Sequence, residues 1–387
     1  MHRPISEVNI ARVLQKLWYS NGISRVDIAR ELRLGKSTVT NIVARLLERN
    51  LVKLVTGGKS GPAGGRRPTH LVINDGYGCV LGVEIQTDSF TAVATNLLGE
   101  VVFSHSEQME FSGSIVSSFA KVMRVLDYRM EGLSLPLIGI GVGIAGIIDP
   151  YAGAIVQSNP LDIHERVDLE AQIATTRNVP VLIENDAKCC CWGELAFRKR
   201  ERHTNFMFVL GEFRKGRTSD PGYWGVAVGF AFVLNGRVYH GEDFSAGEFQ
   251  SILWEEGNQG QFSVHDDESR RVKEDPAVRS RIFTELSAHI AFLVNTLNLT
   301  SVVIGGEIAS YRQDLAATLQ REIQRNWSYE NEVRCSIEFA AFGDRAVAYG
   351  AAGMFLERFF SVPDVVETPE RSAARKIGAL YAQRSPQ

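Results

Sequence analysis

The chain has 387 residues, of which 44% are hydrophobic and 22% are charged, and its formal net charge is −3. These proportions are those of a globular protein, so the composition excludes a wholly disordered chain. No apolar run reaches the length of a membrane span, and residues 1–9 lack the apolar core of a signal peptide. We therefore expect a cytoplasmic protein of two or three domains with no membrane partner.

The small net charge conceals two opposed parts of the chain. Residues 1–70 contain 13 basic and four acidic residues, which gives them a net charge of +9 and leaves −12 for the rest. A basic module of this kind is typical of proteins that bind a polyanion.

Three helices are predicted in the first fifty residues. Apolar residues recur at helical spacing over residues 10–18, 26–32 and 39–47. Ser24 is a candidate N-cap of the second helix and Ser37 a candidate N-cap of the third. A short glycine-containing turn separates these two helices, which is the arrangement of a helix-turn-helix.

Two predicted strands, at residues 51–55 and 69–73, flank a glycine-rich basic loop and complete a winged helix over residues 1–73. Short polar side chains on the third helix can hydrogen-bond to base edges, and its cations can reach phosphates. Arginines on the wing can enter the minor groove. The candidate residues for binding a double-stranded DNA operator are Ser24, Arg25, Lys36, Ser37, Thr38, Thr40, Asn41, Arg45, Arg66 and Arg67. The alternative is a three-helix packing module whose charges are only solvated.

The remaining residues predict two α/β halves with similar order. The first half has strands at 80–85, 91–96, 101–104, 138–144 and 179–183, with helices at 115–130 and 187–200. The second half has strands at 206–210, 226–234, 237–239 and 301–304, with a helix at 279–297. Each half opens with an antiparallel meander and continues with buried, helix-backed strands. This pattern predicts a bilobal protein with a ligand cleft between its lobes.

An ordered set of motifs resembles the ROK family of sugar kinases and sugar-responsive transcription factors. The matching segments are Ser24-Arg25-x-Asp27-Ile28-Ala29, Ser37-Thr38-Val39, Gly65-Arg66-Arg67-Pro68, Gly141–Asp149, Ser158-Asn159-Pro160-Leu161, Glu184-Asn185-Asp186-Ala187, Trp192-Gly193-Glu194, Gly247-Glu248 and Val303-Ile304-Gly305-Gly306. The resemblance implies an α/β protein in which the winged helix-turn-helix precedes a bilobal actin/hexokinase-like (ribonuclease H-like) domain. Its first lobe would cover 79–200 and its second 201–343, followed by a helix at 344–360 that returns to the first lobe and a tail at 361–387.

The resemblance also argues against catalysis. Family kinases place an Asp-x-Gly-Gly-Thr phosphate turn after the first strand, but residues 84–89 here read Glu-Ile-Gln-Thr-Asp-Ser and contain no glycine. Side chains in this turn would block the close approach of a phosphate. The second phosphate loop, with Gly141, Gly143 and Gly146, is retained and is interpreted as vestigial. The alternative for these glycines, and for Gly305-Gly306 at the family's adenosine side, is tight packing of a strand against a helix.

The resemblance assigns binding of a small carbohydrate effector to Asn159, Asn185, Asp186 and Glu248. The Asp that matches Asp186 is the general base in family kinases, whereas here we expect it to act only as a hydrogen-bond acceptor. Amide and carboxylate groups suit a polyol, whose hydroxyls both donate and accept. The alternatives are that Asn185 and Asp186 cap the following helix, and that Glu248 is a solvated loop carboxylate.

No cofactor or metal is expected. Many relatives hold a structural zinc with one His and three Cys, but Ser251 stands at the His position and no Cys lies between Cys191 and Cys335. His265 is interpreted as a surface residue, and Trp254 as a buried ring or a sugar-stacking one. The three consecutive cysteines at 189–191 point in three directions on a helix, which favours apolar packing over a redox role.

Together these features predict a sequence-specific transcriptional regulator, a repressor, whose DNA binding is controlled by a carbohydrate. A homodimer or higher homo-oligomer on a pseudo-palindromic operator is the expected geometry. Two rival hypotheses are an active ATP-dependent sugar kinase that also binds DNA, and an architectural protein that responds to no ligand.

Overall fold

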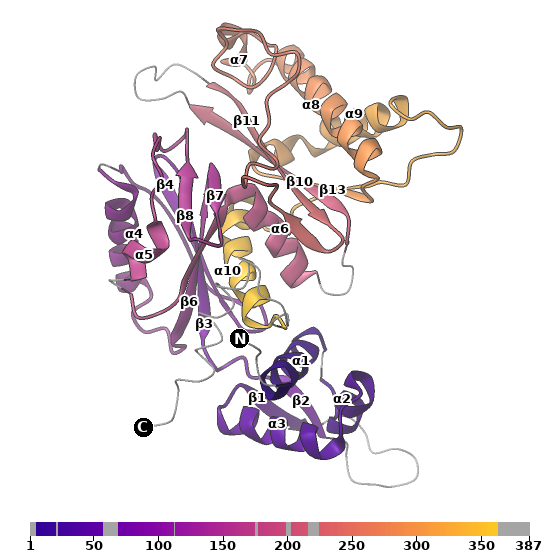
Figure 1. Cartoon of the computed structure of the whole chain (residues 1–387). Helices are drawn as coiled ribbons and strands as arrows, with labels where there is room; N and C mark the ends of the chain where they lie inside the picture. Colours follow the sequence, from indigo (N-terminus) through magenta and orange to yellow (C-terminus); the bar gives the residue numbers. More distant parts are fainter. Residues whose placement is uncertain are drawn as a thin grey trace.

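The computed structural model describes residues 5–20, 22–56, 69–111, 113–174, 177–198, 203–215 and 224–362. A small helical domain at the amino terminus lies below two α/β lobes, which follow one another along the long axis of the molecule (Figure 1). The candidate wing residues Arg66 and Arg67, and the tail from 363 onward, lie outside the described residues.

The amino-terminal domain is a winged helix-turn-helix. Its elements in chain order are α1 (Ile5–Tyr19), α2 (Arg25–Leu32), α3 (Lys36–Glu48), β1 (Val52–Thr56) and β2 (Thr69–Ile73). The two strands pair antiparallel, and apolar side chains from all three helices form the core beneath them. The three predicted helices and the two predicted strands are therefore confirmed.

The two expected helix caps have different outcomes. Ser24 caps α2, since its hydroxyl accepts a hydrogen bond from the backbone N–H of Asp27 at 3.2 Å. The expectation that Ser37 caps α3 is wrong, because the helix begins at Lys36 and its N-cap is Gly35, two residues before Ser37, in the extended conformation. The carbonyl of Gly35 accepts from Val39 N–H, which leaves Ser37 inside the first helical turn.

Lobe 1 is a five-stranded sheet of order β5-β4-β3-β6-β9. Its strands are β3 (Cys79–Ile85), β4 (Ser89–Asn96), β5 (Val101–Gln108), β6 (Leu137–Ile144) and β9 (Val181–Asn185). The first three form the predicted antiparallel meander, and β6 and β9 continue in parallel with β3. The remaining elements are α4 (Ile115–Arg129), α5 (Leu169–Ala174) and the small hairpin of β7 (Ile147–Asp149) and β8 (Ala154–Gln157).

Lobe 2 repeats this topology with the order β12-β11-β10-β13-β14. Its strands are β10 (Phe206–Lys215), β11 (Trp224–Leu234), β12 (Arg237–Tyr239), β13 (Ser301–Gly305) and β14 (Ser336–Phe339). Its helices are α7 (Asp266–Ser269), α8 (Pro276–Leu297), α9 (Arg312–Arg325) and the short 3-10 turns η1 (Glu307–Tyr311) and η2 (Gly343–Arg345). Each lobe thus has three antiparallel strands followed by two parallel ones, as the internal repeat predicted.

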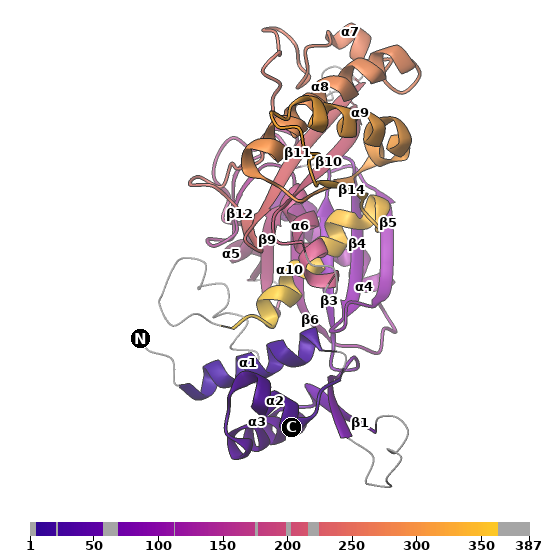
Figure 2. The same cartoon turned by 90° about the vertical axis from the view of Figure 1, so that its right-hand side faces the viewer.

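Two helices, α6 (Asp186–Phe197) and α10 (Ala346–Phe359), lie side by side where the lobes meet (Figures 1 and 2). α10 packs on β3 and β6 from the face opposite α4, and α6 packs on β10 and β11 of lobe 2. The three consecutive cysteines of α6 are fully buried and form no disulfide, as apolar packing predicts.

Glycines allow α10 to lie very close to its neighbours. A Cβ atom at Gly82 would lie 1.8 Å from the carbonyl oxygen of Ala348, and one at Gly141 would lie 2.1 Å from that of Ala351. A Cβ at Gly143 would lie 2.5 Å from Val347, and one at Gly350 of α10 would lie 2.0 Å from the Cys189 carbonyl oxygen. The packing alternative therefore accounts for Gly141 and Gly143 without a phosphate.

None of the helices in the described part of the chain combines the length and the apolar character that crossing a bilayer requires.

We predict that Gly141→Ala lowers the free energy of unfolding by about 3 kcal/mol, because backbone and not a flexible side chain opposes the added methyl group. Gly229→Ala is the matched control: its Cβ would meet only Ala187, at an ordinary 3.5 Å. Urea unfolding of both variants measures the difference. Equal destabilisation of the two would show that the contact between β6 and α10 is not as close as described.

Candidate DNA-binding face and effector site

The candidate recognition residues of α3 are exposed on one side of the helix. Ser37, Asn41 and Arg45 follow one another at four-residue spacing and so share one stripe. Lys36 and Thr40 lie beside them, and the Thr40 hydroxyl donates to the Lys36 carbonyl at 2.9 Å. The buried stripe of Val39, Ile42, Val43 and Leu46 fixes the orientation of this face, because it packs into the domain core.

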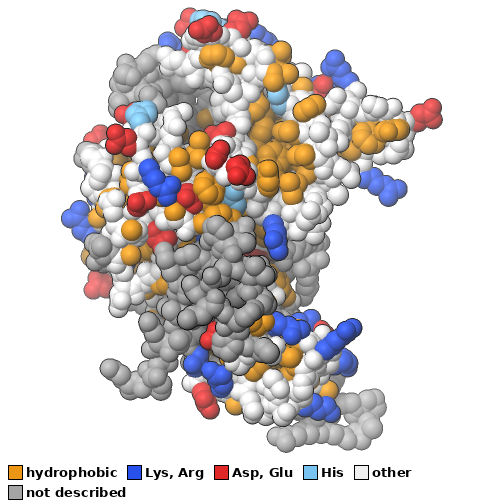
Figure 3. Space-filling view, viewed as in Figure 1, with side chains coloured by type: hydrophobic (Ala, Val, Ile, Leu, Met, Phe, Trp, Pro, Cys, Tyr) orange, Lys and Arg blue, Asp and Glu red, His pale blue; other side chains and the backbone are white. Residues whose placement is uncertain are grey.

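Positive charge accompanies this face. Figure 3 shows Lys and Arg side chains gathered around the amino-terminal domain, while both signs are scattered over the visible side of the lobes. Among the residues of the turn before α2, Ser24 uses its hydroxyl in the cap and also donates to the Asp27 carboxylate at 2.6 Å. Ser24 therefore acts as a structural cap. Arg25, the first residue of α2, and the exposed side of α3 form the described part of the candidate DNA-binding surface.

The candidate sugar residues of lobe 1 lie at the junction of β9 and α6. Asn185 caps α6: its Oδ1 accepts from Lys188 N–H, and its Nδ2 donates to the Gly146 carbonyl, each at 3.0 Å. The capping alternative therefore describes Asn185, whose amide is engaged within lobe 1. Asp186 follows it, is 9% exposed, and accepts from the N–H of Ala187 at 2.8 Å.

Glu248 of lobe 2 lies within electrostatic range of Asp186. Glu248 is exposed, yet the protein atoms around it and the negative charge of Asp186 raise its pKa, while Lys188 acts in the opposite direction. The charges of these two predicted acceptors, which come from different lobes, thus act on one another. Asn159 is exposed on the loop after β8, where it accepts from Gln157 at 3.3 Å.

A buried carboxylate–imidazole pair joins the two lobes next to these residues. Glu184 at the end of β9 is 0% exposed, and its Oε2 lies 2.8 Å from Nε2 of His240, which follows β12 and is 7% exposed. Trp192 donates to the same carboxylate at 3.2 Å. Burial alone raises the pKa of Glu184, but His240, followed by Lys188 and Arg358, lowers it to about 2.

Lys188 makes a second connection between the lobes. It is 1% exposed, and its ammonium donates to the carbonyl of Phe244 in lobe 2 at 3.0 Å. Tyr151 of lobe 1 contacts the rings of His240 and Phe244 edge-on, with centroids 5.6 and 5.9 Å away. The sequence analysis included Glu184 in a motif but assigned it no role, and it did not single out His240 or Lys188. Only the folded chain brings the segment after β12 to the junction of β9 and α6.

Side chains fill the turn that corresponds to the first phosphate turn. Glu84 is 5% exposed and accepts from Gln86 Nε2 at 2.7 Å, and Ser89 donates to Gln86 Oε1 at 2.9 Å. At the adenosine-side loop of lobe 2, a Cβ on Gly306 would lie 2.3 Å from the Gly211 carbonyl oxygen and 2.7 Å from a Glu212 carboxylate oxygen. A carboxylate therefore lies in each region, and the loop at Gly306 is also in close contact with backbone.

Side chains of α8 hold the loop that resembles the family's zinc-binding segment. Glu285 accepts from both the N–H and the hydroxyl of Ser263, and His289 Nε2 accepts from Ile252 N–H. No group of three or more potential metal-ligating side chains occurs among the described residues. His265 is 71% exposed, as expected of a surface residue.

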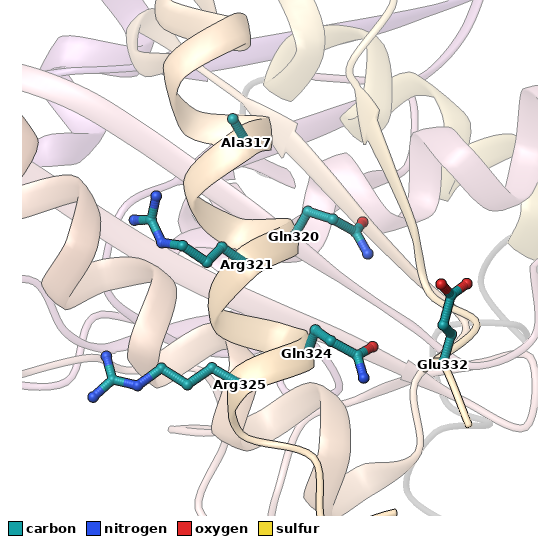
Figure 4. A pocket seen from close by; sticks show the side chains of 6 residues that line it. All are labelled: Ala317, Gln320, Arg321, Gln324, Arg325 and Glu332. Carbon is teal, nitrogen blue, oxygen red and sulfur yellow. The ribbon is translucent and has the colours of Figure 1, made fainter. Parts of the chain in front are cut away.

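A shallow, solvent-open cavity of about 610 Å³, lined by exposed residues, lies elsewhere, along α9 and the segment before β14 (Figure 4). Gln320 and Gln324 point toward Glu332 across it, whereas Arg321 and Arg325 point to the other side of the helix. None of the candidate effector residues lines this cavity.

Comparisons with known proteins agree with this organisation. Residues 80–262 match the model of the ROK family, and residues 9–53 match that of the MarR family. The protein therefore carries a ROK family domain behind a MarR-type winged helix-turn-helix.

Two relatives and two solved structures are particularly similar. The xylose repressor of Caldicellulosiruptor bescii is 25% identical over 94% of this chain and 99% of its own length. The xylose repressor of Bacillus spizizenii is 27% identical over 63% of this chain and 60% of its own length. A ROK family transcriptional regulator, a homologue of the Escherichia coli MLC protein, has the same fold over 97% of this chain and 98% of its own, with a TM-score of 0.74 at 17% identity. A ROK family glucokinase from Streptomyces griseus covers 72% of this chain and 99% of its own, with a TM-score of 0.55 at 17% identity.

We predict that His240→Ala lowers the free energy of unfolding by about 3 kcal/mol at pH 7, because it removes the imidazole that contacts the fully buried Glu184 carboxylate. His164→Ala is the matched control, since His164 and Asp162 form an exposed pair 3.1 Å apart, for which about 1 kcal/mol or less is expected. Urea unfolding measures both values.

The pH dependence gives a second readout of the same pair. Because the pKa of Glu184 is depressed in the folded protein, its contribution is present above about pH 4.5 and is lost as the pH falls toward about 2. His240→Ala raises the pKa of Glu184, so it reduces this acid-dependent contribution. If the free energy of unfolding falls with decreasing pH as steeply in the variant as in the wild type, His240 does not lower the pKa of Glu184.

Proposed function

We propose that this protein is a sequence-specific DNA-binding transcriptional repressor whose affinity for its operator is controlled by a carbohydrate bound near Asp186 and Glu248. The observation that carries the proposal is the exposed polar and basic stripe of α3, in a winged helix-turn-helix joined to a ROK domain. The relative that aligns over 94% of this chain is named a xylose repressor, which supports the same role here.

The DNA-binding part of the proposal assigns two kinds of contact to α3. Ser37, Thr38 and Asn41 read base edges, because their short polar side chains lie at the amino-terminal end of an exposed helix. Lys36 and Arg45 neutralise phosphates, with Arg66 and Arg67 on the wing. A homodimer or higher homo-oligomer presents two such helices to two half-sites.

The effector part of the proposal uses the carboxylates of both lobes. Asp186 and Glu248 accept hydrogen bonds from sugar hydroxyls, while Glu184, Lys188 and His240 fix the surrounding backbone and the distance between the lobes. A ligand that contacts both lobes binds more tightly to one lobe arrangement than to another. The ligand therefore shifts the protein toward the lobe arrangement that it prefers, and this shift changes the affinity for DNA.

Catalysis is not part of the proposed function. Gln86 and Ser89 fill the turn that family kinases keep open for phosphate, and the carboxylate of Glu212 lies beside Gly306. Both arrangements disfavour a nucleotide, since a phosphate needs open backbone N–H groups and positive charge. Zinc is also not part of it, because Glu285 and His289 accept hydrogen bonds from the corresponding loop and Gln261 donates one within it.

We predict that Asn41→Ala relaxes sequence preference, with a loss of about 1–3 kcal/mol of discrimination between the operator and a variant operator. Arg45→Ala instead weakens binding to all duplexes about equally. It also reduces the magnitude of the slope of log K against log salt concentration by about one for each DNA-binding domain. Fluorescence anisotropy with duplexes from the gene's own upstream region measures both effects.

Arg129→Ala, on α4 of lobe 1, is the control with an equivalent loss of charge far from α3. It should leave DNA binding unchanged. The assignment of α3 is wrong if Arg129→Ala and Arg45→Ala weaken binding equally, and the DNA-binding function is wrong if the wild type binds no duplex at low salt.

We predict that an effector raises the melting temperature of the wild type by roughly 5 °C at about a hundredfold excess over its Kd. A panel of pentoses and hexoses that includes D-xylose is screened by thermal shift. Asp186→Asn should weaken the sugar found by about tenfold or more, because it replaces a charged acceptor by an amide.

Asp162→Asn, an exposed carboxylate of the same lobe, is the control and should bind the sugar normally. ADP release is measured with the same sugars and ATP. Sugar-dependent ADP formation that Asp186→Asn abolishes would replace the proposed repressor by an active kinase that binds DNA.

A further inference from the structure

One turn of lobe 1 contacts both the DNA-binding domain and α10. The β4–β5 turn (Leu97–Gly99) presents two carbonyl groups, two residues apart, to rings from different parts of the chain. Trp18 of α1 donates from Nε1 to the Leu97 carbonyl at 3.0 Å, and Tyr349 of α10 donates from its hydroxyl to the Gly99 carbonyl at 2.9 Å. Trp18 is 3% exposed and Tyr349 is 5% exposed, so both hydrogen bonds lie in the interior.

The turn itself is held firmly in place. The side-chain Oδ1 of Asn96 accepts from Leu98 N–H and Glu100 N–H at 2.9 and 3.0 Å. Gly99 has a φ of +88°, and a Cβ there would lie 2.5 Å from the ring of Phe197 on α6. A displacement of α6 or α10 therefore moves the turn as a whole instead of deforming it.

On the other side, Tyr349 connects to lobe 2. Its ring stacks on Phe342, with centroids 3.7 Å apart, and packs against Phe197 at 4.1 Å. Phe342 lies just after β14, in the segment that leads from the lobe 2 sheet into α10, and the N–H of Ala340 in that segment donates to Ile304 of β13. The Tyr349 ring thus lies between the exit of lobe 2 and the β4–β5 turn.

The DNA-binding domain is docked on lobe 1 at the same place. Trp18 stacks on Phe360, directly after α10, with centroids 4.8 Å apart and planes 16° apart, and Tyr19 donates to the Glu357 carboxylate at 3.0 Å. The core of the amino-terminal domain is continuous with apolar residues of lobe 1 and α10. Both views show the end of α10 just above α1 (Figures 1 and 2).

We propose that Trp18, the β4–β5 turn and Tyr349 form a joint that transmits movements of lobe 2 to the recognition helix α3. Trp18 and Tyr349 are positioning residues in this joint, because neither belongs to the DNA-binding face or to the effector site. A rotation of lobe 2 shifts Phe342 against Tyr349, the turn follows through Gly99, and Trp18 carries α1 with it. The inference rests on the proposed function, since it needs a protein that binds DNA.

Coupling between two sites is reciprocal, so DNA binding must also change lobe 2 and the start of α10. This allows a test that needs no effector. The probe is a duplex from the gene's own upstream region, and the readout is amide hydrogen exchange over residues 336–351 of the full-length protein, with and without DNA. In the wild type, we expect DNA to change the exchange rates of these amides by about fivefold or more.

Tyr349→Phe removes the hydroxyl but keeps the stacked ring, and Trp18→Phe removes the indole N–H but keeps a ring against Phe360. Each variant should bind the duplex within about threefold of the wild type, yet lose most of the exchange response. Tyr128→Phe, at a tyrosine 73% exposed on α4, is the matched control and should respond as the wild type does. A merely structural role of the two hydrogen bonds would lower stability without removing the response.

Three outcomes would overturn the inference. Wild-type protein that binds DNA with no change of exchange over residues 336–351 refutes the joint while leaving the proposed function intact. Variants that respond as strongly as the wild type show that coupling bypasses these two rings, and Trp18→Phe decides this if Tyr349→Phe does not fold. Wild-type protein that binds no duplex refutes the proposed function and, with it, the joint.

Discussion

The close contact between α10 and its glycine-lined neighbours is the constraint on which the rest of the structure depends. Gly82 and Gly141 bring two strands within backbone contact of Ala348 and Ala351, and Gly350 does the same between α10 and α6. A helix seated this closely cannot shift alone, because protein interiors are densely packed and transmit strain. Near its start, α10 holds Tyr349 against Phe342 of lobe 2. Directly after its end, Phe360 lies against Trp18 of the DNA-binding domain.

The DNA-binding domain and the two lobes carry net charges of opposite sign. The first 70 residues carry a charge of +9 and the rest −12, so the lobes are repelled by DNA while the amino-terminal domain is attracted to it. Inside, the Glu184–His240 pair and Lys188 bridge the lobes at the candidate effector site. Such a pair contributes little net stability over an apolar contact, but breaking it is costly, so it favours one well-defined arrangement of the lobes.

Polar side chains hydrogen-bond to one another in the turn after β3, the turn that by resemblance corresponds to the first phosphate turn of family kinases. Function resides in sites and not in folds, and the changes at this site are local: Gln86 and Ser89 in one turn, Glu212 beside Gly306 in the other. The glycines that resemble a second phosphate loop have a separate reason to persist, since α10 needs them. The glycine motif alone therefore does not distinguish a phosphate-binding loop from a surface on which a helix packs closely. The atoms that lie next to each glycine in the folded structure make that distinction.

The sequence by itself determined the elements and their order, because periodicity, turn residues and local charge are properties of short segments. It predicted the winged helix, the two meanders, the burial of Cys189–Cys191 and the exposed stripe from Ser37 to Arg45. It misplaced the cap of α3, which is Gly35 in an extended conformation, two residues before the expected Ser37. Arg66 and Arg67, on the predicted wing, stay a prediction.

Only the tertiary structure decided which distant residues share a site. Asn185 donates to the carbonyl of Gly146, 39 residues before it, and His240 is the partner of Glu184 although 56 residues separate them. Trp18, Leu97, Gly99 and Tyr349 meet from three parts of the chain, and no local pattern marks them. Their contacts arise from how α1, the β4–β5 turn and α10 pack in three dimensions, which spacing along the sequence does not encode.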